Sequence, residues 1–219
     1  GVPMGLQYSI TAIGSVILQV AVNSLGSLSV AAVTAASKVL NFLACPFDAL
    51  GSTMATYGAQ NVGASRYDRL NKGIYSASLM GFGYSLLAFG VAWFFGRSLT
   101  GLFVSGDSSA QLVELAQTYM ITNVLAYPLL TLVNVVRFTI QGMGFSMFAI
   151  LAGVMEMAAR SLAGMFLVPA LGYFGAALGS PLAWVAADLF LVPAYFRCRR
   201  VLMSQSHHLH VMGERAELN

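Results

Sequence analysis

The sequence predicts an all-α fold, an integral membrane bundle of six transmembrane helices. Of the 219 residues, 58% are hydrophobic and only 9% are charged, whereas a soluble domain carries about 25% charged residues. Six mostly apolar stretches are long enough to cross the hydrocarbon core, which takes about 20 helical residues. Connectors rich in Gly, Ser, Asn and Asp separate these stretches. The expected spans are residues 4–25, 32–61, 73–97, 113–140, 147–169 and 175–197.

The first two spans differ in length. The first follows Pro3, and proline is tolerated in a first helical turn because its missing N–H has no partner there. The second is about 30 residues, or roughly 45 Å at 1.5 Å per residue, which exceeds a hydrocarbon core of about 30 Å. We therefore expect it to tilt, bend or protrude, with the bend at Pro46.

The remaining spans carry small residues and prolines. Gly81 and Gly83 in the third span allow helices to approach closely in lipid. Pro128 in the fourth span and Pro193 in the sixth predict kinks. A kink in a membrane serves either helix packing or a transport cavity, and both interpretations stay open.

Ionisable side chains at membrane depth cost a few kcal/mol each, so each is a functional candidate. Glu156 and Arg160 lie four residues apart on one face of the fifth span. They form either a structural ion pair or a pair in which Glu156 exchanges protons or cations. The candidates for a cavity or ion-coupling role are Lys38, Asp48, Glu156, Arg160 and Asp188.

The other intramembrane polar residues have less specific roles. Lys38 and Asp48 lie about 80° apart around their helix, so that both could point into one cavity or each could form a structural pair. Asp188 has no local partner and is a candidate proton carrier. We expect Arg137 to extend to the membrane surface or to contact the following loop. The candidate polar lining residues are Gln19, Asn23, Asn41 and Asn134, and Gln7 and Asn123 could add hydrogen-bonding positions along a cavity.

Two basic clusters predict the orientation in the membrane. Four spans separate the clusters, so they lie on the same face, and an excess of Lys and Arg is typical of the cytoplasmic face. We expect a multi-pass plasma-membrane protein with both termini in the cytoplasm, a transmembrane lobe at 1–200 and a polar cytoplasmic tail at 201–219. The clusters are Arg66, Arg69 and Lys72 after the second span, and Arg197, Arg199 and Arg200 after the sixth.

Other kinds of chemistry are missing from the sequence. All three histidines lie in the tail, so no zinc-protease motif can sit in the membrane. The connectors contain no phosphate-binding loop, nucleophile elbow or dinucleotide fingerprint. We therefore expect no enzymatic activity, no metal site and no cofactor other than a coupling ion. The basic residues lie in short clusters between spans, which predicts no nucleic-acid partner.

Several stretches are similar to MATE (multidrug and toxic-compound extrusion) transporters. The most specific is AQNVGASRYDR within residues 31–73, and the opening GVPMGLQYS resembles the start of the family's seventh helix. The resemblance covers almost everything from residue 1 to about residue 200. It implies that the chain is the C-terminal six-helix lobe of a twelve-helix MATE transporter, either as a fragment or as a natural half-transporter. The other similar stretches are VVRFTIQGMGFS (135–146), GVMEMAARS (153–161) and LGYFGAALGSPLAW (171–184).

The resemblance implies a secondary antiporter. It would export cationic or amphiphilic drugs, dyes or metabolites in exchange for sodium ions or protons, by rocking of two lobes in the membrane lipid. The partner would be the N-terminal six-helix lobe, which the first two helices would face. The alternative is a lipid-linked sugar or polysaccharide flippase of the same superfamily, because Lys38, Arg137 and Arg160 could bind a pyrophosphate.

This sequence departs from the family at two places. Some members carry one acidic residue in the seventh helix and another in the tenth, and both are implicated in cation coupling. The corresponding regions here read LQYSITAIG and LAYPLLTLVN, without Asp or Glu. Coupling would therefore depend on the other intramembrane charges or on the N-terminal lobe.

Overall fold

The computed structural model describes residues 2–104 and 110–218, and every regular element within these ranges is a helix. The all-α fold class is therefore confirmed. The first half contains α1 (Val2–Asn23), α2 (Ser27–Gly63) and α3 (Asp68–Phe103). The second half contains α4 (Ala110–Leu125), α5 (Tyr127–Gly142), α6 (Ser146–Leu162), the π-helix η1 (Ala163–Leu167), α7 (Val168–Leu171), α8 (Tyr173–Ala177) and α9 (Gly179–Glu217).

Six membrane crossings account for these helices. Five are continuous stretches long and apolar enough to span, at Val2–Asn23, Ser27–Gly63, Asp68–Phe103, Ser146–Leu171 and Tyr173–Glu217. The sixth is the pair of α4 and α5, which is bent by 48° at Ala126. Pro128 lies in the first turn of α5, so the kink expected in the fourth span occurs as a break between two helices.

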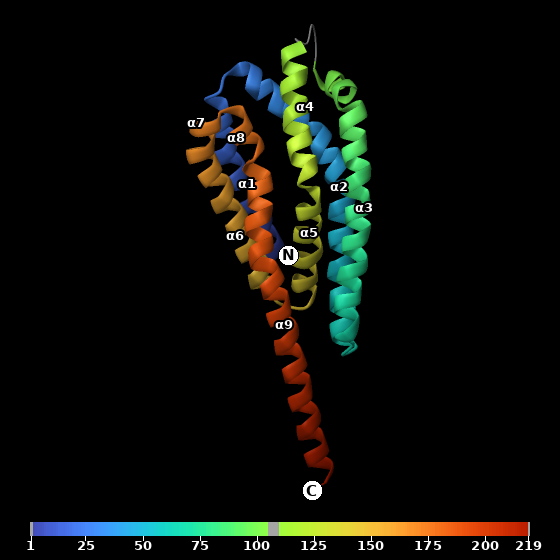
Figure 1. Ribbon diagram of the computed structural model, residues 1–219. Helices are drawn as coiled ribbons and strands as arrows, with labels where there is room; N and C mark the ends of the chain where they lie inside the picture. The colour runs from blue at the N-terminus through green and yellow to red at the C-terminus, as the bar shows by residue number, and fades with distance from the viewer. Residues whose placement is uncertain (1, 105–109, 219) are drawn as a thin grey trace.

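The helices form two groups that meet along α5. Figure 1 shows α2, α3, α4 and α5 on one side of the bundle, with α1, α6 and α9 on the other. α5 packs against α2 and α3 in its own group and against α6 and α9 across the bundle. Side chains on α5 and α6 can therefore meet at membrane depth.

α9 is the longest helix, with 39 residues. It is continuous through Pro193 and runs on well past the other helices to the C-terminal end of the chain (Figure 1). Residues 201–217 of the expected tail are therefore helical.

Large apolar side chains cover the outside of the bundle. Leu86 and Phe94 on α3 and Leu189 on α9 each expose about three quarters of their surface, at 76%, 77% and 74%. A soluble monomer rarely leaves such a surface uncovered. In a membrane-spanning lobe, such side chains are suited to contact with lipid or with a neighbouring lobe.

Glycines bring the helices close together at several crossings. A Cβ atom added to Gly14 on α1 would lie 2.9 Å from the Cα atom of Met157 on α6. A Cβ at Gly81 on α3 would overlap the side chain of Thr131 on α5, whereas Gly83 has no neighbouring atom within 4 Å. Close packing, which the sequence suggested for both Gly81 and Gly83, therefore applies to Gly81 and not to Gly83.

α2 continues as one helix through Pro46, and its N-terminal part crosses the bundle obliquely before α2 runs beside α3 (Figure 1). Two tyrosines hydrogen-bond to its backbone just before Pro46. The Tyr84 hydroxyl donates to the Leu43 carbonyl at 2.6 Å, and the Tyr127 hydroxyl donates to the Leu40 carbonyl at 3.1 Å. Such bonds stabilise the backbone near a proline, which removes a helical donor.

Replacing Tyr84 with phenylalanine is expected to lower the free energy of unfolding by about 1 kcal/mol, because one partly buried hydrogen bond is lost. Thermal unfolding in detergent measures the change. Tyr75→Phe on the same helix is the matched control, since Tyr75 is 67% exposed. Equal destabilisation by both changes would contradict a role for the Tyr84 hydroxyl in holding α2.

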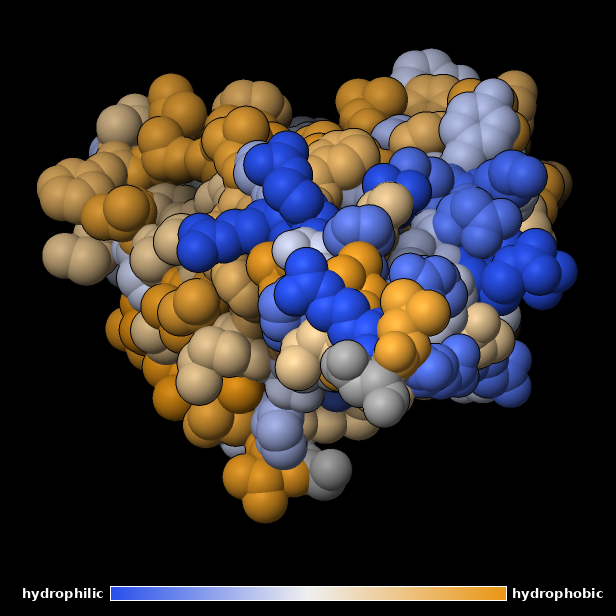
Figure 2. Space-filling model, turned by 90° about the horizontal axis from the view of Figure 1, so that it is seen from below, coloured by the Kyte–Doolittle hydropathy of each residue, from blue (hydrophilic) through white to orange (hydrophobic). Residues whose placement is uncertain are grey.

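The two basic clusters lie at the same end of the bundle. Arg199 on α9 donates from Nε to the Tyr67 carbonyl at 3.4 Å, and the Tyr195 hydroxyl on α9 donates to Oδ1 of Asn71 at 2.6 Å. These bonds hold the connector between α2 and α3 beside α9. Figure 2, which views the bundle from below, shows hydrophilic residues gathered among apolar ones. This common end agrees with the parity of the spans, and its assignment to the cytoplasmic face stays a prediction.

Candidate functional site

A buried ion-pair cluster joins α5 and α6. One oxygen of Glu156, Oε1, lies 2.8 Å from Nη2 of Arg137, and the other, Oε2, lies 3.6 Å from Nη1 of Arg160. The three residues are 3%, 8% and 7% exposed respectively. One carboxylate thus forms ion pairs with two guanidinium groups at membrane depth.

The positions of these three side chains follow from helix geometry. Glu156 and Arg160 are four residues apart on α6 and share one face. α5 packs against that face, so Arg137 comes to lie opposite Glu156. The expectation that Arg137 would extend to the membrane surface or to a loop was wrong, because a carboxylate on the neighbouring helix lies closer than the surface.

Asp188 on α9 lies near this cluster. It is 8% exposed, and it interacts electrostatically with Glu156 and Arg137. Neither of its carboxylate oxygens has a hydrogen-bond partner within the described ranges. It also borders an apolar groove between α5 and α9 that contains Leu129 and Pro193. The structure thus brings Asp188 near Glu156 and Arg137 at membrane depth.

The two charged candidates on α2 do not join the cluster. Lys38 and Asp48 are both exposed on the outer surface of the lobe. The Nζ atom of Lys38 lies 5.9 Å from the centroid of the Phe103 ring, which is a cation–π arrangement. Neither residue lines the cavity described below.

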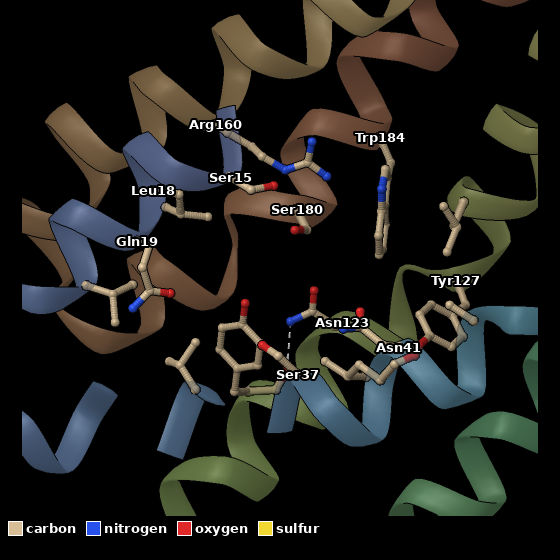
Figure 3. Close-up of a pocket in the computed structure, with 16 residues that line it drawn as sticks. Ser15, Leu18, Gln19, Ser37, Asn41, Asn123, Tyr127, Arg160, Ser180 and Trp184 are labelled. Carbon is tan, nitrogen blue, oxygen red and sulfur yellow. Dashed lines mark hydrogen bonds between the residues drawn. The ribbon is translucent and has the colours of Figure 1, made fainter. Parts of the chain in front are cut away.

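A cavity of about 350 Å³ opens between the two groups of helices (Figure 3). Arg160 reaches into it from α6, and the π-helix η1 begins three residues later at Ala163. π-helical turns are frequent at functional sites. The other polar and aromatic lining residues are Ser15, Gln19, Ser37, Asn41, Tyr119, Asn123, Tyr127, Ser180 and Trp184.

The polar residues suggested by the sequence are divided between the cavity and its surroundings. Gln19 and Asn41 line the cavity. Asn23 lies one turn from Gln19, whose Nε2 donates to Oδ1 of Asn23 at 3.1 Å. Asn134 is buried in α5 and is not among the residues that line the cavity.

The comparisons with known proteins fit this architecture. The model of the family described as MatE matches residues 3–157, well over half of the chain. The chain belongs to the MATE family. The family resemblance read from the sequence is therefore confirmed, and no curated protein matches this MATE chain in sequence.

Solved MATE-type structures share the fold. A MOP superfamily transporter from Pyrococcus furiosus is 21% identical with a TM-score of 0.74, and the match covers 87% of this chain and 42% of that one. A MATE structure in the bent conformation is 21% identical with a TM-score of 0.77, covering 86% and 42%. An outward-facing multidrug resistance MATE transporter is 21% identical with a TM-score of 0.73, covering 87% and 42%. The chain thus spans less than half the length of these structures.

Several lining residues of this MATE lobe were not among the site residues proposed from the sequence. Serine is common in membrane helices, so Ser15 and Ser37 do not by themselves indicate a cavity in the sequence. Tyr119 lies on α4, four residues before Asn123 and on the same helix face, whereas Tyr127 begins α5 beyond the break at Ala126. The spacing from Asn123 is the signal that could have identified Tyr119.

Proposed function

We propose that this chain forms one lobe of a secondary antiporter that exports drugs, dyes or metabolites in exchange for sodium ions or protons. A second six-helix lobe, N-terminal in the complete transporter, would be its partner. The two lobes would rock against each other and open a central cavity to each side of the plasma membrane in turn. Both termini would lie in the cytoplasm.

The observation that carries the proposal is the buried carboxylate of Asp188 beside the Arg137–Glu156 ion pair. A carboxylate at membrane depth without a hydrogen-bond donor is costly unless a proton or a cation neutralises it. Binding and release of that ion would change the balance of charge between α5, α6 and α9. These helices belong to both groups of the bundle, so the ion could bias their relative position.

The shape of the lobe cavity supports a small organic substrate over a lipid-linked pyrophosphate. Its volume is about 350 Å³, and one guanidinium group, that of Arg160, faces it. A flippase for pyrophosphate-linked sugars would need a wider cavity with more positive charge. Lys38 and Arg137, which kept that alternative open, do not line the cavity.

The function is tested by dye efflux from cells that contain the complete transporter, and by dye uptake into inside-out vesicles prepared from them. Efflux is expected to rise when an inward sodium or proton gradient is imposed and to fall when that gradient is dissipated. Efflux that ignores both gradients would contradict antiport. Movement of a lipid-linked sugar in place of the dye would support the flippase.

Replacing Asp188 with asparagine is expected to abolish the dependence of efflux on the ion gradient, because the amide can neither release a proton nor balance a cation. The variant should fold, since asparagine has nearly the same volume. Asp68→Asn is the control, because Asp68 is exposed and pairs with exposed Arg66. If efflux by the Asp188 variant depended on the gradient as strongly as efflux by the control, Asp188 would have a structural role and no coupling role.

A further inference from the structure

The charge that faces the lobe cavity is positive. Among the described residues that line it, Arg160 is the one ionisable side chain that is charged at neutral pH. The remaining polar groups are hydroxyls and amides. Glu156, which pairs with Arg160, does not line the cavity, so the charged group that a ligand meets there is the guanidinium, and this favours an anion over a cation.

Arg160 keeps binding capacity for an anion. Glu156 makes its short contact with Arg137 at 2.8 Å and its long contact with Arg160 at 3.6 Å. Nη1 of Arg160 has no hydrogen-bond partner in the part of the chain that the structure describes, although the residue is only 7% exposed. A buried guanidinium group in this state can bind a carboxylate or another oxyanion through parallel N–H bonds.

A helix N-terminus lies at the same place. α9 begins at Gly179, and the next residue, Ser180, lines the cavity. Figure 3 shows the side chains of Arg160 and Ser180 directed toward the same space. No side chain caps the start of this 39-residue helix, and its first turn can offer a ligand the backbone N–H groups of Gly179 and Ser180, because Pro181 has none and Leu182 donates to the Leu178 carbonyl. The guanidinium group and the start of the helix thus both favour binding of an anion.

The aromatic lining of the cavity suits an apolar or aromatic body. The rings of Tyr127 on α5 and Trp184 on α9 line the cavity with centroids 6.1 Å apart and an angle of 54° between their planes. Asn123 donates from Nδ2 to the Ala177 carbonyl at 3.4 Å and so ties α4 to the turn before α9. A molecule with an aromatic ring and an acidic group could contact these rings and Arg160 together.

We propose that the cavity binds an oxyanion, carried on an amphiphilic organic molecule or a lipid, between Arg160 and the first turn of α9. This inference rests on the proposed transport function, because it names the class of substrate that the lobe would carry. It differs from the cationic substrates that the family resemblance implies.

Equilibrium binding of two dyes to the complete transporter in phosphatidylcholine nanodiscs tests the proposal. Fluorescein and a rhodamine ester share a xanthene ring, but the first is an anion and the second a cation. Fluorescein is expected to bind, and Arg160→Gln is expected to weaken its binding about tenfold to a hundredfold, because one charge-assisted hydrogen-bonding group is lost. Rhodamine ester binding should not weaken in this variant. Arg160→Lys should retain part of the fluorescein affinity.

Two further variants keep the test decisive. Ser180→Asp places a carboxylate at the start of α9 and should weaken fluorescein binding without removing Arg160, so it serves if Arg160→Gln does not fold. Arg200→Gln removes an exposed charge on α9 that lies 20 residues after Ser180 and outside the cavity lining, and it should leave binding unchanged. Equal fluorescein affinity in the wild type, Arg160→Gln and Ser180→Asp would overturn the proposal.

The source of the oxyanion is resolved by adding phosphatidylglycerol to the nanodiscs. Displacement of fluorescein by this lipid, dependent on Arg160, would assign the site to a lipid phosphate. Undiminished fluorescein binding would assign it to a soluble organic anion. Fluorescein binding that depends on Arg160, without ion-driven transport, would support the oxyanion site and contradict the antiporter. Ion-driven rhodamine efflux without fluorescein binding would support the antiporter and contradict the oxyanion site.

Discussion

Replacing Glu156 with glutamine is expected to lower the free energy of unfolding by about 3–5 kcal/mol, because it leaves two buried guanidinium groups without their shared carboxylate. Arg137 and Arg160 are only 8% and 7% exposed, so water could replace little of the lost contact, and only Arg160 borders the cavity. Denaturant or thermal unfolding of the complete transporter in detergent measures the loss. The same change should reduce the amount of folded protein recovered from membranes.

Two comparisons separate the effect of charge from that of side-chain replacement. Asp68→Asn breaks an ion pair whose partners are 51% and 60% exposed, so it should cost less than about 1 kcal/mol. A triple variant with Glu156→Leu, Arg137→Met and Arg160→Met should recover much of the stability, because a buried ion cluster can be replaced by apolar packing. If Glu156→Gln were as stable as Asp68→Asn, the cluster would not hold α5 to α6.

Replacing Gly81 with alanine is expected to destabilise the lobe by about 1–3 kcal/mol through overpacking. The new Cβ atom would overlap the side chain of Thr131 on α5. Thr131 cannot move aside, because it is fully buried and its hydroxyl donates to the Tyr127 carbonyl at 3.1 Å. Unfolding in detergent, measured as for the Glu156 variant, gives the size of the effect.

Gly83, two residues along α3, provides the matched control. No atom lies within 4 Å of a Cβ added there, so Gly83→Ala should be neutral or stabilising by up to about 1 kcal/mol, since alanine is the better helix former. The double variant Gly81→Ala with Thr131→Ala should recover part of the loss, which a double-mutant cycle would report as coupling. Equal effects at positions 81 and 83 would contradict the close crossing of α3 and α5.

The sequence was sufficient to predict the six membrane crossings. Apolar run length, turn residues in the connectors and the position of Pro128 are local signals, and the break between α4 and α5 lies two residues before that proline. The length of α9 was not apparent from the same signals. Residues 201–217 contain few apolar side chains, and their helical structure continues from a helix that is already formed in the membrane.

The candidate site was only partly predictable, because it depends on which helices lie side by side. The spacing of Glu156 and Arg160 showed that they share one helix face, and the ion pair between them is present at 3.6 Å. The shorter contact of Glu156 with Arg137 joins two helices, and helical periodicity gives no information about such a contact. For the same reason Lys38, which could have faced a cavity, lies instead beside Phe103 on the outside.

The most direct test of ion-coupled transport is the ion flux that a substrate drives. Proteoliposomes containing the complete transporter would be loaded with a pH-sensitive or sodium-sensitive dye, with no ion gradient imposed, and a substrate would be added outside. Substrate movement down its gradient is expected to drive protons or sodium ions the opposite way, and Asp188→Asn should abolish this flux. Substrate movement without any accompanying ion flux in the wild type would contradict antiport.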